Sequence, residues 1–175
     1  MQIVIQHFTH TTSSLLCAHL THYTINDMQS VNIIVGSQMG SAEYVAEQLA
    51  EALEQQGIQV KLHEQPVFND IDQQDTIWLL CTSTYGAGDY PENLLPFIES
   101  VNQQIDLKGL KYSVIGLGDT SYDTYNYAGR HIDDLFISKG ASRVAERLEL
   151  NILDEQLPED TALAWLPSWI KSVGL

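Results

Sequence analysis

The chain has 175 residues, of which 44% are hydrophobic and 18% are charged, proportions typical of a folded domain rather than a disordered chain. It carries 23 acidic residues against 8 Lys and Arg, a formal net charge of -15, which argues against partners such as nucleic acid or an anionic membrane surface. No apolar run approaches the roughly 20 residues of a membrane-spanning helix. The acidity fits either simple solubility or attraction of a basic protein partner.

Residues 1–28 differ in composition from the remainder, and we assign them to a weakly ordered N-terminal tail that precedes one folded domain, residues 29–175. The tail lacks the basic start and the long apolar centre of a secretory signal. Met28 stands just before the first convincing strand, so a start at this codon is one hypothesis. We expect no metal site in the tail, although one alternative set of ligands is His7, His10, Cys17, His19 and His22.

Strand-like and helix-like segments alternate from Val31 onward. VNIIVG (31–36) predicts a buried strand, and the segment after it predicts a helix that ends at Gly57. IQVKLH (58–63) alternates as an edge strand does, and DTIWLLCTS (75–83) is the continuous apolar run of a central strand. The apolar face of the helix is formed by Ala42, Val45, Ala46, Leu49 and Leu53.

The second half of the chain continues the same alternation. A helix opens at Pro91, with Pro96 tolerated early in it, and KYSVIGLG (111–118) predicts another central strand. A third helix precedes Gly140, and SRVAERLEL (142–150) predicts a final strand. The last helix has a Pro that we expect to kink or split it; its notable residues are Ala162, Trp165, Leu166, Pro167, Trp169, Ile170 and Val173.

These elements predict an α/β fold, a doubly wound five-stranded parallel sheet of order 2-1-3-4-5 with helices on both faces. In this topology ligands bind at the carboxyl ends of the first and third strands, where the strand order reverses. We therefore expect the functional site just after Gly36, Ser83 and Gly116.

Three loops of unusual composition follow these positions. GSQMGSA (36–42) has small residues that let backbone N–H groups converge at a helix start, an arrangement that binds phosphate without a cation. TSTYGAGDYPEN (82–93) and GLGDTSYDTYNYAG (116–129) place Tyr85 and Tyr122 beside glycine-rich backbone. Two aromatic loops that face each other predict a slot for a flat ring.

Other classes of protein that share this topology fit the sequence less well. A response-regulator receiver needs acidic residues after the first strand and a phosphoacceptor Asp after the third. Gly36 and Ser37 stand after the first strand instead of acidic residues. The Gly-x-Gly-x-x-Gly and Gly-Lys-Ser/Thr phosphate motifs do not open the first helix. The two cysteines, Cys17 and Cys81, supply no disulfide framework, and the absence of such a framework favours a reducing compartment.

GSQMGSAEYVAEQLAEAL, CTSTYGAGDYPENLLPF and IGLGDTSYDTYNYAG resemble the three cofactor loops of the flavodoxin family, over about residues 30–173. LNILD and the PED…WLPSW ending most resemble the short-chain MioC-type members, which bind FMN. The resemblance implies that the FMN phosphate lies on Ser37, Gln38, Met39, Gly40, Ser41 and Ala42. It implies that Tyr85 and Tyr122 sandwich the isoalloxazine ring. The polar edge of the ring would meet Ser83, Thr84, Gly86, Ala87, Gly88, Leu117, Gly118 and Asp119, with Asp123, Tyr125 and Asn126 nearby.

The resemblance also implies a function. Flavodoxins are one-electron carriers, so we expect a non-catalytic, cytoplasmic FMN protein that takes electrons from a basic-faced flavodoxin/ferredoxin-NADP reductase-type donor. The acceptor would be a metalloenzyme, for example an iron-sulfur protein. The alternative is an FMN-dependent NAD(P)H:quinone-type oxidoreductase of the same fold. The family loop usually has Thr at the positions of Met39 and Ser41, so Met39 removes one hydroxyl donor.

Overall fold

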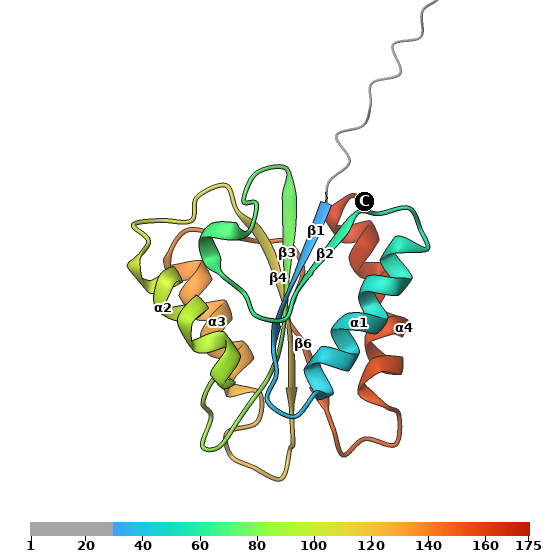
Figure 1. Ribbon diagram of the computed structural model, residues 1–175. Coiled ribbons are helices and arrows are strands. Elements are labelled where there is room, and N and C mark those ends of the chain that lie inside the picture. Colours follow the sequence, from blue (N-terminus) through green and yellow to red (C-terminus); the bar gives the residue numbers. More distant parts are fainter. Residues whose placement is uncertain (1–29) are drawn as a thin grey trace, which may run out of the picture.

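A parallel sheet between two layers of helices forms the protein, for which a computed structural model describes residues 30–175 (Figure 1). The predictions for residues 1–28, including the histidine and Cys17 set and the role of Met28, lie outside the described residues. Among residues 30–175, no helix has both the length and the apolar character that crossing a membrane requires.

The strands are β1 (Ser30–Gly36), β2 (Val60–His63), β3 (Thr76–Ser83), β4 (Lys111–Gly118), β5 (Ser142–Arg143) and β6 (Leu148–Asn151). The sheet has the order β2-β1-β3-β4-β5, and β6 also pairs with β4. Every pairing is parallel. The register aligns Gly36 with Thr82 and Ser83 with Leu117, so three strands end at one level. The predicted fold class and strand order are confirmed.

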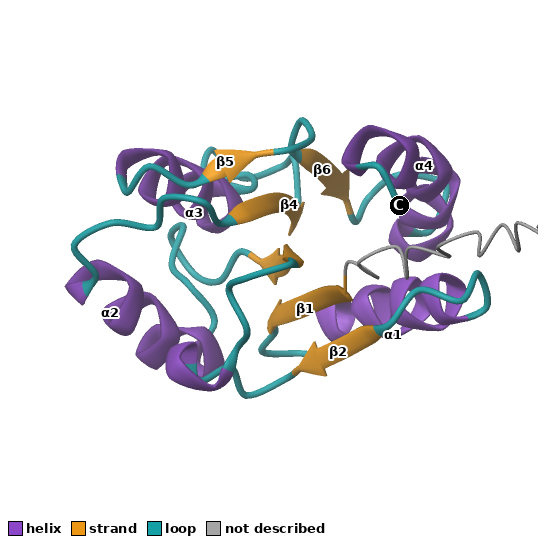
Figure 2. Ribbon diagram, turned by 90° about the horizontal axis from the view of Figure 1, so that it is seen from above, coloured by secondary structure: helices purple, strands orange, loops and turns teal. Residues whose placement is uncertain are grey.

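Apolar residues on both faces of the central strands hold the sheet between the helices. Helices α1 (Ser41–Glu54) and α4 (Pro158–Val173) cover one face, and α2 (Leu95–Gln103) and α3 (Tyr127–Ser138) cover the other (Figure 2). The buried residues of α1 are the five that its sequence pattern predicts. Neighbouring strand residues alternate between the two cores: Ile33, Leu79 and Ile115 face α1 and α4, whereas Ile34, Leu80 and Val114 face α2 and α3.

The prediction of one continuous final strand over 142–150 is wrong, because the segment forms two short strands, β5 and β6. Between them the chain bends, which lets Arg143 and Arg147 both reach the buried carboxylate of Asp133. In a continuous strand the Cα atoms of these two residues would stand about 13 Å apart. Tyr112 donates a further hydrogen bond of 2.7 Å to Asp133.

Two helix predictions need adjustment. The helix expected at Pro91 begins as a short 3-10 turn, Glu92–Leu94, and becomes α-helical only at Leu95, which puts Pro96 in its first turn. A split of the last helix is wrong, since α4 is continuous through Pro167. Its buried residues lie on both sides of Pro167, and their packing on the sheet holds the two halves in one helix. A second 3-10 turn, Phe68–Asp70, precedes β3.

Candidate functional site

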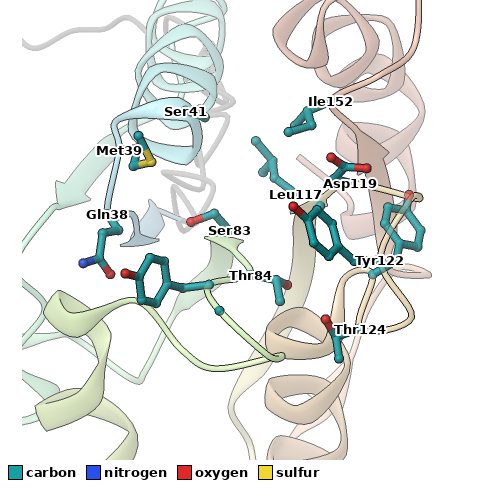
Figure 3. Close-up of a pocket in the computed structure, with 14 residues that line it drawn as sticks. Gln38, Met39, Ser41, Ser83, Thr84, Leu117, Asp119, Tyr122, Thr124 and Ile152 are labelled. Carbon is teal, nitrogen blue, oxygen red and sulfur yellow. The ribbon is translucent and has the colours of Figure 1, made fainter.

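A cavity of about 480 Å³ lies at the carboxyl ends of β1, β3, β4 and β6, where the topology predicts a site. Figure 3 shows Gln38, Met39 and Ser41 on one side, Ser83 and Thr84 in the middle, and residues of the third loop opposite. The cavity is lined by Gln38, Met39, Ser41, Ser83, Thr84, Tyr85, Gly86, Leu117, Gly118, Asp119, Tyr122, Thr124, Tyr125 and Ile152.

The first loop presents unpaired backbone donors at the start of α1. Gly40 has a left-handed conformation, with φ of 87°, and its N–H donates to Ser37 Oγ at 3.0 Å. This closes the turn that opens the helix. The N–H groups of Gln38, Met39, Ser41 and Ala42 donate to no other group among residues 30–175. Together with the positive end of the helix dipole, these free donors suit an anion.

The second loop is a short closed turn that holds Tyr85 at the cavity. Tyr85 N–H donates to Asp89 O at 3.0 Å, and Asp89 N–H donates back to Tyr85 O at 2.8 Å. Gly86 lies inside this turn with φ of 53°, which a residue with a side chain adopts at a cost. The N–H of Thr84 donates to Leu117 O at 3.0 Å and so ties the second loop to the third.

The third loop turns around Asp119. Ser121 N–H donates to the Asp119 carboxylate at 2.8 Å, and Tyr122 N–H donates to the Asp119 carbonyl at 3.2 Å. Asp119 therefore organises the turn that carries Tyr122, a structural role for a carboxylate that also faces the cavity. Tyr122 is 64% exposed and Tyr85 is 48% exposed. Both rings are therefore free to cover a flat ligand.

Asn126, which the resemblance places near the ring or the ribityl chain, is not among the residues that line the cavity. It is fully buried, has a left-handed backbone with φ of 56°, and precedes α3. Its side-chain oxygen crowds Gly116 and Gly118, and neither polar atom of its amide has a hydrogen-bond partner among the described residues. Its position is explained by the left-handed backbone, which Asn tolerates better than most residues.

The structure brings together twelve of the nineteen residues that the resemblance implies and leaves seven off the cavity wall. These seven are Ser37, Gly40, Ala42, Ala87, Gly88, Asp123 and Asn126. Two lining residues were not predicted, Thr124 and Ile152. Thr124 lies between Asp123 and Tyr125, two residues that were predicted, so its place in the sequence could have indicated it. Ile152 follows β6, and only the pairing of β6 with β4 brings it to the site.

An ion pair supports the wall of the cavity behind Tyr125. Arg130 donates to both carboxylate oxygens of Glu149, at 2.9 and 2.8 Å, and its guanidinium carbon lies 5.7 Å from the centre of the Tyr125 ring. The hydrogen bonds from Arg130 hold the pKa of Glu149 below its ordinary value, and Arg147 adds to this effect. Burial, aided by the charge of Glu149, raises the pKa of the Tyr125 hydroxyl. Tyr125 is therefore a neutral hydrogen-bonding group at physiological pH.

The lining residues include no Lys, Arg, His or Cys, and Asp119 is their one carboxylate. Cys81 is buried beneath the first loop, where its thiol donates to Ala42 O at 3.4 Å and burial raises its pKa to about 12. This thiol therefore stays protonated and takes no part in nucleophilic chemistry. What the cavity offers is backbone donors, hydroxyl groups and tyrosine rings.

The comparisons with known proteins agree with this geometry. The family model described as Flavodoxin matches residues 33–165, and the chain belongs to the flavodoxin family. Within the family it is 42% identical to Protein MioC of Escherichia coli over 144 residues, 82% of this chain and 97% of the relative. It is 32% identical to Flavodoxin YqcA of Escherichia coli, over 81% of this chain and 97% of that one. The recognition of a MioC-type flavodoxin is confirmed.

A solved structure shows that the similarity extends to the fold. A mutant flavodoxin from Pseudomonas aeruginosa superposes with a TM-score of 0.77 at 29% identity, over 84% of this chain and 100% of that chain. Flavodoxins bind FMN, which confirms the predicted cofactor and places the chain among the FMN electron carriers.

The residues of the cavity fit FMN. The unpaired N–H groups of the first loop suit a phosphate, and the exposed rings of Tyr85 and Tyr122 suit a flat tricyclic ring. The backbone of the second and third loops supplies polar groups at the level where the strands end. No cationic side chain from residues 30–175 lines the cavity, so the phosphate would be held by neutral donors and the helix dipole.

Proposed function

We propose that this protein is a cytoplasmic FMN carrier that relays single electrons from an NADPH-dependent reductase to metalloenzymes such as iron-sulfur proteins. When bound, FMN accepts and returns electrons one at a time. The proposal rests on one observation above all: the cavity is open and its two covering tyrosines are half exposed, so that a partner can approach the flavin directly.

In this proposal the three loops share the binding of FMN. The first loop holds the phosphate through the N–H groups of residues 38–42, and Tyr85 and Tyr122 cover the two faces of the ring. Asp119 keeps Tyr122 in place through the turn that it organises. The remaining implied residues off the cavity wall, such as Gly88 and Asn126, act by shaping the loops.

The surface around the cavity suits a partner with a basic face. Three large exposed residues with apolar surface line the cavity: Met39, Tyr122 and Ile152, which are 88%, 64% and 48% exposed. Asp119 lines the cavity, and the loops that supply its lining carry three exposed acidic residues, Asp89, Asp123 and Asp154. A surface with apolar residues next to charges of one sign is usual in transient complexes whose association is steered by electrostatics.

The same carboxylates favour a low reduction potential. A carboxylate about 10 Å from the ring opposes an added electron by ~0.4 kcal/mol in a water-like dielectric, roughly 20 mV for one electron. Several such groups together lower the potential by a useful amount, less at high salt. An electron carrier gains from this arrangement, because it passes electrons on to acceptors of higher potential.

A reduction assay tests the proposal. The protein is reconstituted with FMN, and its flavin absorbance is followed without oxygen, first with NADPH alone and then with NADPH and a ferredoxin-NADP reductase. We expect rapid reduction only with the reductase, at a rate that falls as salt rises. Comparable reduction by NADPH alone would favour the quinone-type oxidoreductase, and failure to bind FMN would refute the proposal.

Matched variants test the docking surface in the same assay. Asp123→Asn and Asp154→Asn each remove one exposed charge near the cavity, and we expect both to slow reduction by the reductase at low salt. Glu54→Gln removes an exposed charge at the far end of α1 and serves as the control. Equal rates for all three variants would contradict docking at this face. Cell fractionation tests the cytoplasmic location.

A further inference from the structure

Asn93 joins three segments of backbone beside the cavity. It lies in the 3-10 turn Glu92–Leu94, at the end of the second loop. Its side-chain NH₂ donates to Val35 O at 2.9 Å and to Glu64 O at 2.7 Å. Its side-chain oxygen accepts from Ser37 N–H at 3.0 Å. One amide thus connects the end of β1, the end of β2 and the first loop.

The orientation of this amide is fixed by its partners. Both donors of the Asn93 NH₂ face carbonyl oxygens, and the carbonyl faces an N–H. A rotation by 180° would place oxygen against two carbonyl oxygens and NH₂ against an N–H, so the reverse orientation is excluded. An Asp or a Leu at this position cannot make the same three bonds.

The contact at Ser37 continues into the phosphate-binding part of the loop. Ser37 N–H is occupied by Asn93, and Ser37 Oγ accepts from Gly40 N–H at 3.0 Å. Gly40 is the residue from which α1 starts, and its carbonyl accepts the N–H of Tyr44 at 2.9 Å. A chain of hydrogen bonds therefore runs from Asn93 through Ser37 to the first turn of the helix.

The two ends of this loop, Gly36 and Ala42, are buried, but few other contacts hold its middle. The side chains of Gln38 and Met39 are exposed, so they contribute little packing. Ser83 Oγ donates to Gly36 O at 3.4 Å, a long hydrogen bond. Asn93 is therefore the main side chain from outside the loop that determines the backbone conformation at Ser37.

We propose that Asn93 is a positioning residue that presets the first loop for a phosphate and so makes the site select FMN over riboflavin. This inference rests on the proposed placement of the FMN phosphate on residues 38–42. Because Asn93 occupies Ser37 N–H, the donors left for the phosphate are those further along the loop. A loop that is ordered before binding loses less conformational entropy when the phosphate arrives.

The test compares the affinities of the flavin-free protein for FMN and for riboflavin, measured by quenching of flavin fluorescence. Asn93→Ala removes all three hydrogen bonds, and Asn93→Leu removes them while it keeps a side chain of similar size. We expect both to weaken FMN binding about 10-fold and riboflavin binding less than about 2-fold, the scale of one or two lost hydrogen bonds. Asn102→Ala, which removes a hydrogen bond to Ile98 O within α2, is the control and should leave the ratio unchanged.

The outcomes separate this inference from the proposed function. If the unaltered protein binds no FMN, the proposed function fails; if it binds FMN and both Asn93 variants keep its FMN-to-riboflavin ratio, only the role of Asn93 is overturned. Equal losses for both flavins would also overturn it, because they indicate a general loss of structure. Amide exchange at Ser37 gives a direct readout in the flavin-free protein, and we expect it to be faster in Asn93→Leu. If Asn93→Ala does not fold, the flavin affinities of Asn93→Leu decide the test.

Discussion

Replacement of Glu149 by Gln tests the ion pair behind the cavity wall. The Glu149 carboxylate accepts three hydrogen bonds, two from Arg130 at 2.9 and 2.8 Å and one from Arg147 at 3.0 Å. These bonds connect β6 to α3 and to the bend between β5 and β6. Gln keeps the size of the side chain and one acceptor, but it removes the negative charge.

The expected loss follows from the exposure of the partners. Hydrogen bonds to a charged group contribute about 1.5–3 kcal/mol when buried, but exposed ion pairs contribute about 1 kcal/mol or less. The side chains of Glu149 and Arg130 are 23% and 39% exposed, which is between these cases. We expect Glu149→Gln to lower the free energy of unfolding at pH 7 by about 1–2 kcal/mol.

The pH dependence gives the sign of the effect. The pKa of Glu149 is lower in the folded protein than its ordinary value, because Arg130 stabilises the charged form. Its contribution to stability is therefore complete above the unfolded pKa of about 4.3 and is lost as the pH falls through the lower folded pKa. The difference between the unaltered protein and Glu149→Gln should then shrink toward zero at acid pH.

Urea unfolding followed by circular dichroism, repeated between pH 7 and pH 3.5, measures this difference. Glu155→Gln is the control, since Glu155 is exposed and forms no hydrogen bond with another residue in the described part of the chain. A difference that stays constant with pH, or that is absent at pH 7, would refute the reasoning about this ion pair.

Three further predictions concern the core and its borders. Gly118→Ala should destabilise the protein by about 1–3 kcal/mol in urea unfolding, because a Cβ there would lie 2.8 Å from the backbone N of Asn126; a neutral effect would contradict the close approach. Cys81, whose pKa is raised by burial to about 12, should resist alkylation at pH 8 in the folded protein and react once it is unfolded, as peptide mapping that separates it from Cys17 can show. Early labelling of Cys81 would show that this region opens. Pro167→Ala should stabilise the protein by about 1–3 kcal/mol, since it restores a backbone donor inside a continuous helix, and a loss of stability would mean that the helix needs the proline.

Most of the fold could be predicted because the signals are local. The apolar runs of β1, β3 and β4 and the one-sided stripe of α1 reflect burial that each segment needs by itself. The strand order followed from the alternation of strands and helices, since parallel strands need right-handed crossovers. The last strand could not be predicted in the same way. Arg143 and Arg147, on either side of its division, both pair with Asp133 of α3, and a contact with so distant a residue leaves no pattern in the sequence of the strand.

The residues of the site also differ in whether the sequence could predict them. Gln38, Tyr85 and Tyr122 could be predicted because their loops directly follow strands that end at one edge. Ile152 could not, because it reaches the cavity only through the pairing of β6 with β4. The burial of Asn126 against Gly116 and Gly118 of β4 likewise depends on the folded structure, through a left-handed backbone at the start of α3.

By itself, then, the sequence determined the elements, their order and the edge of the sheet at which three loops meet, because hydrophobic period and turn chemistry are properties of neighbouring residues. Only the tertiary structure decided which polar groups of those loops remain unpaired. The N–H of Ser37 is occupied by Asn93, 56 residues away, whereas the N–H groups of Gln38 and Met39 are left free among the described residues. Hydrogen bonds between segments distant in the chain have no period to reveal them, so the donors of the phosphate-binding loop could be identified only in the folded protein.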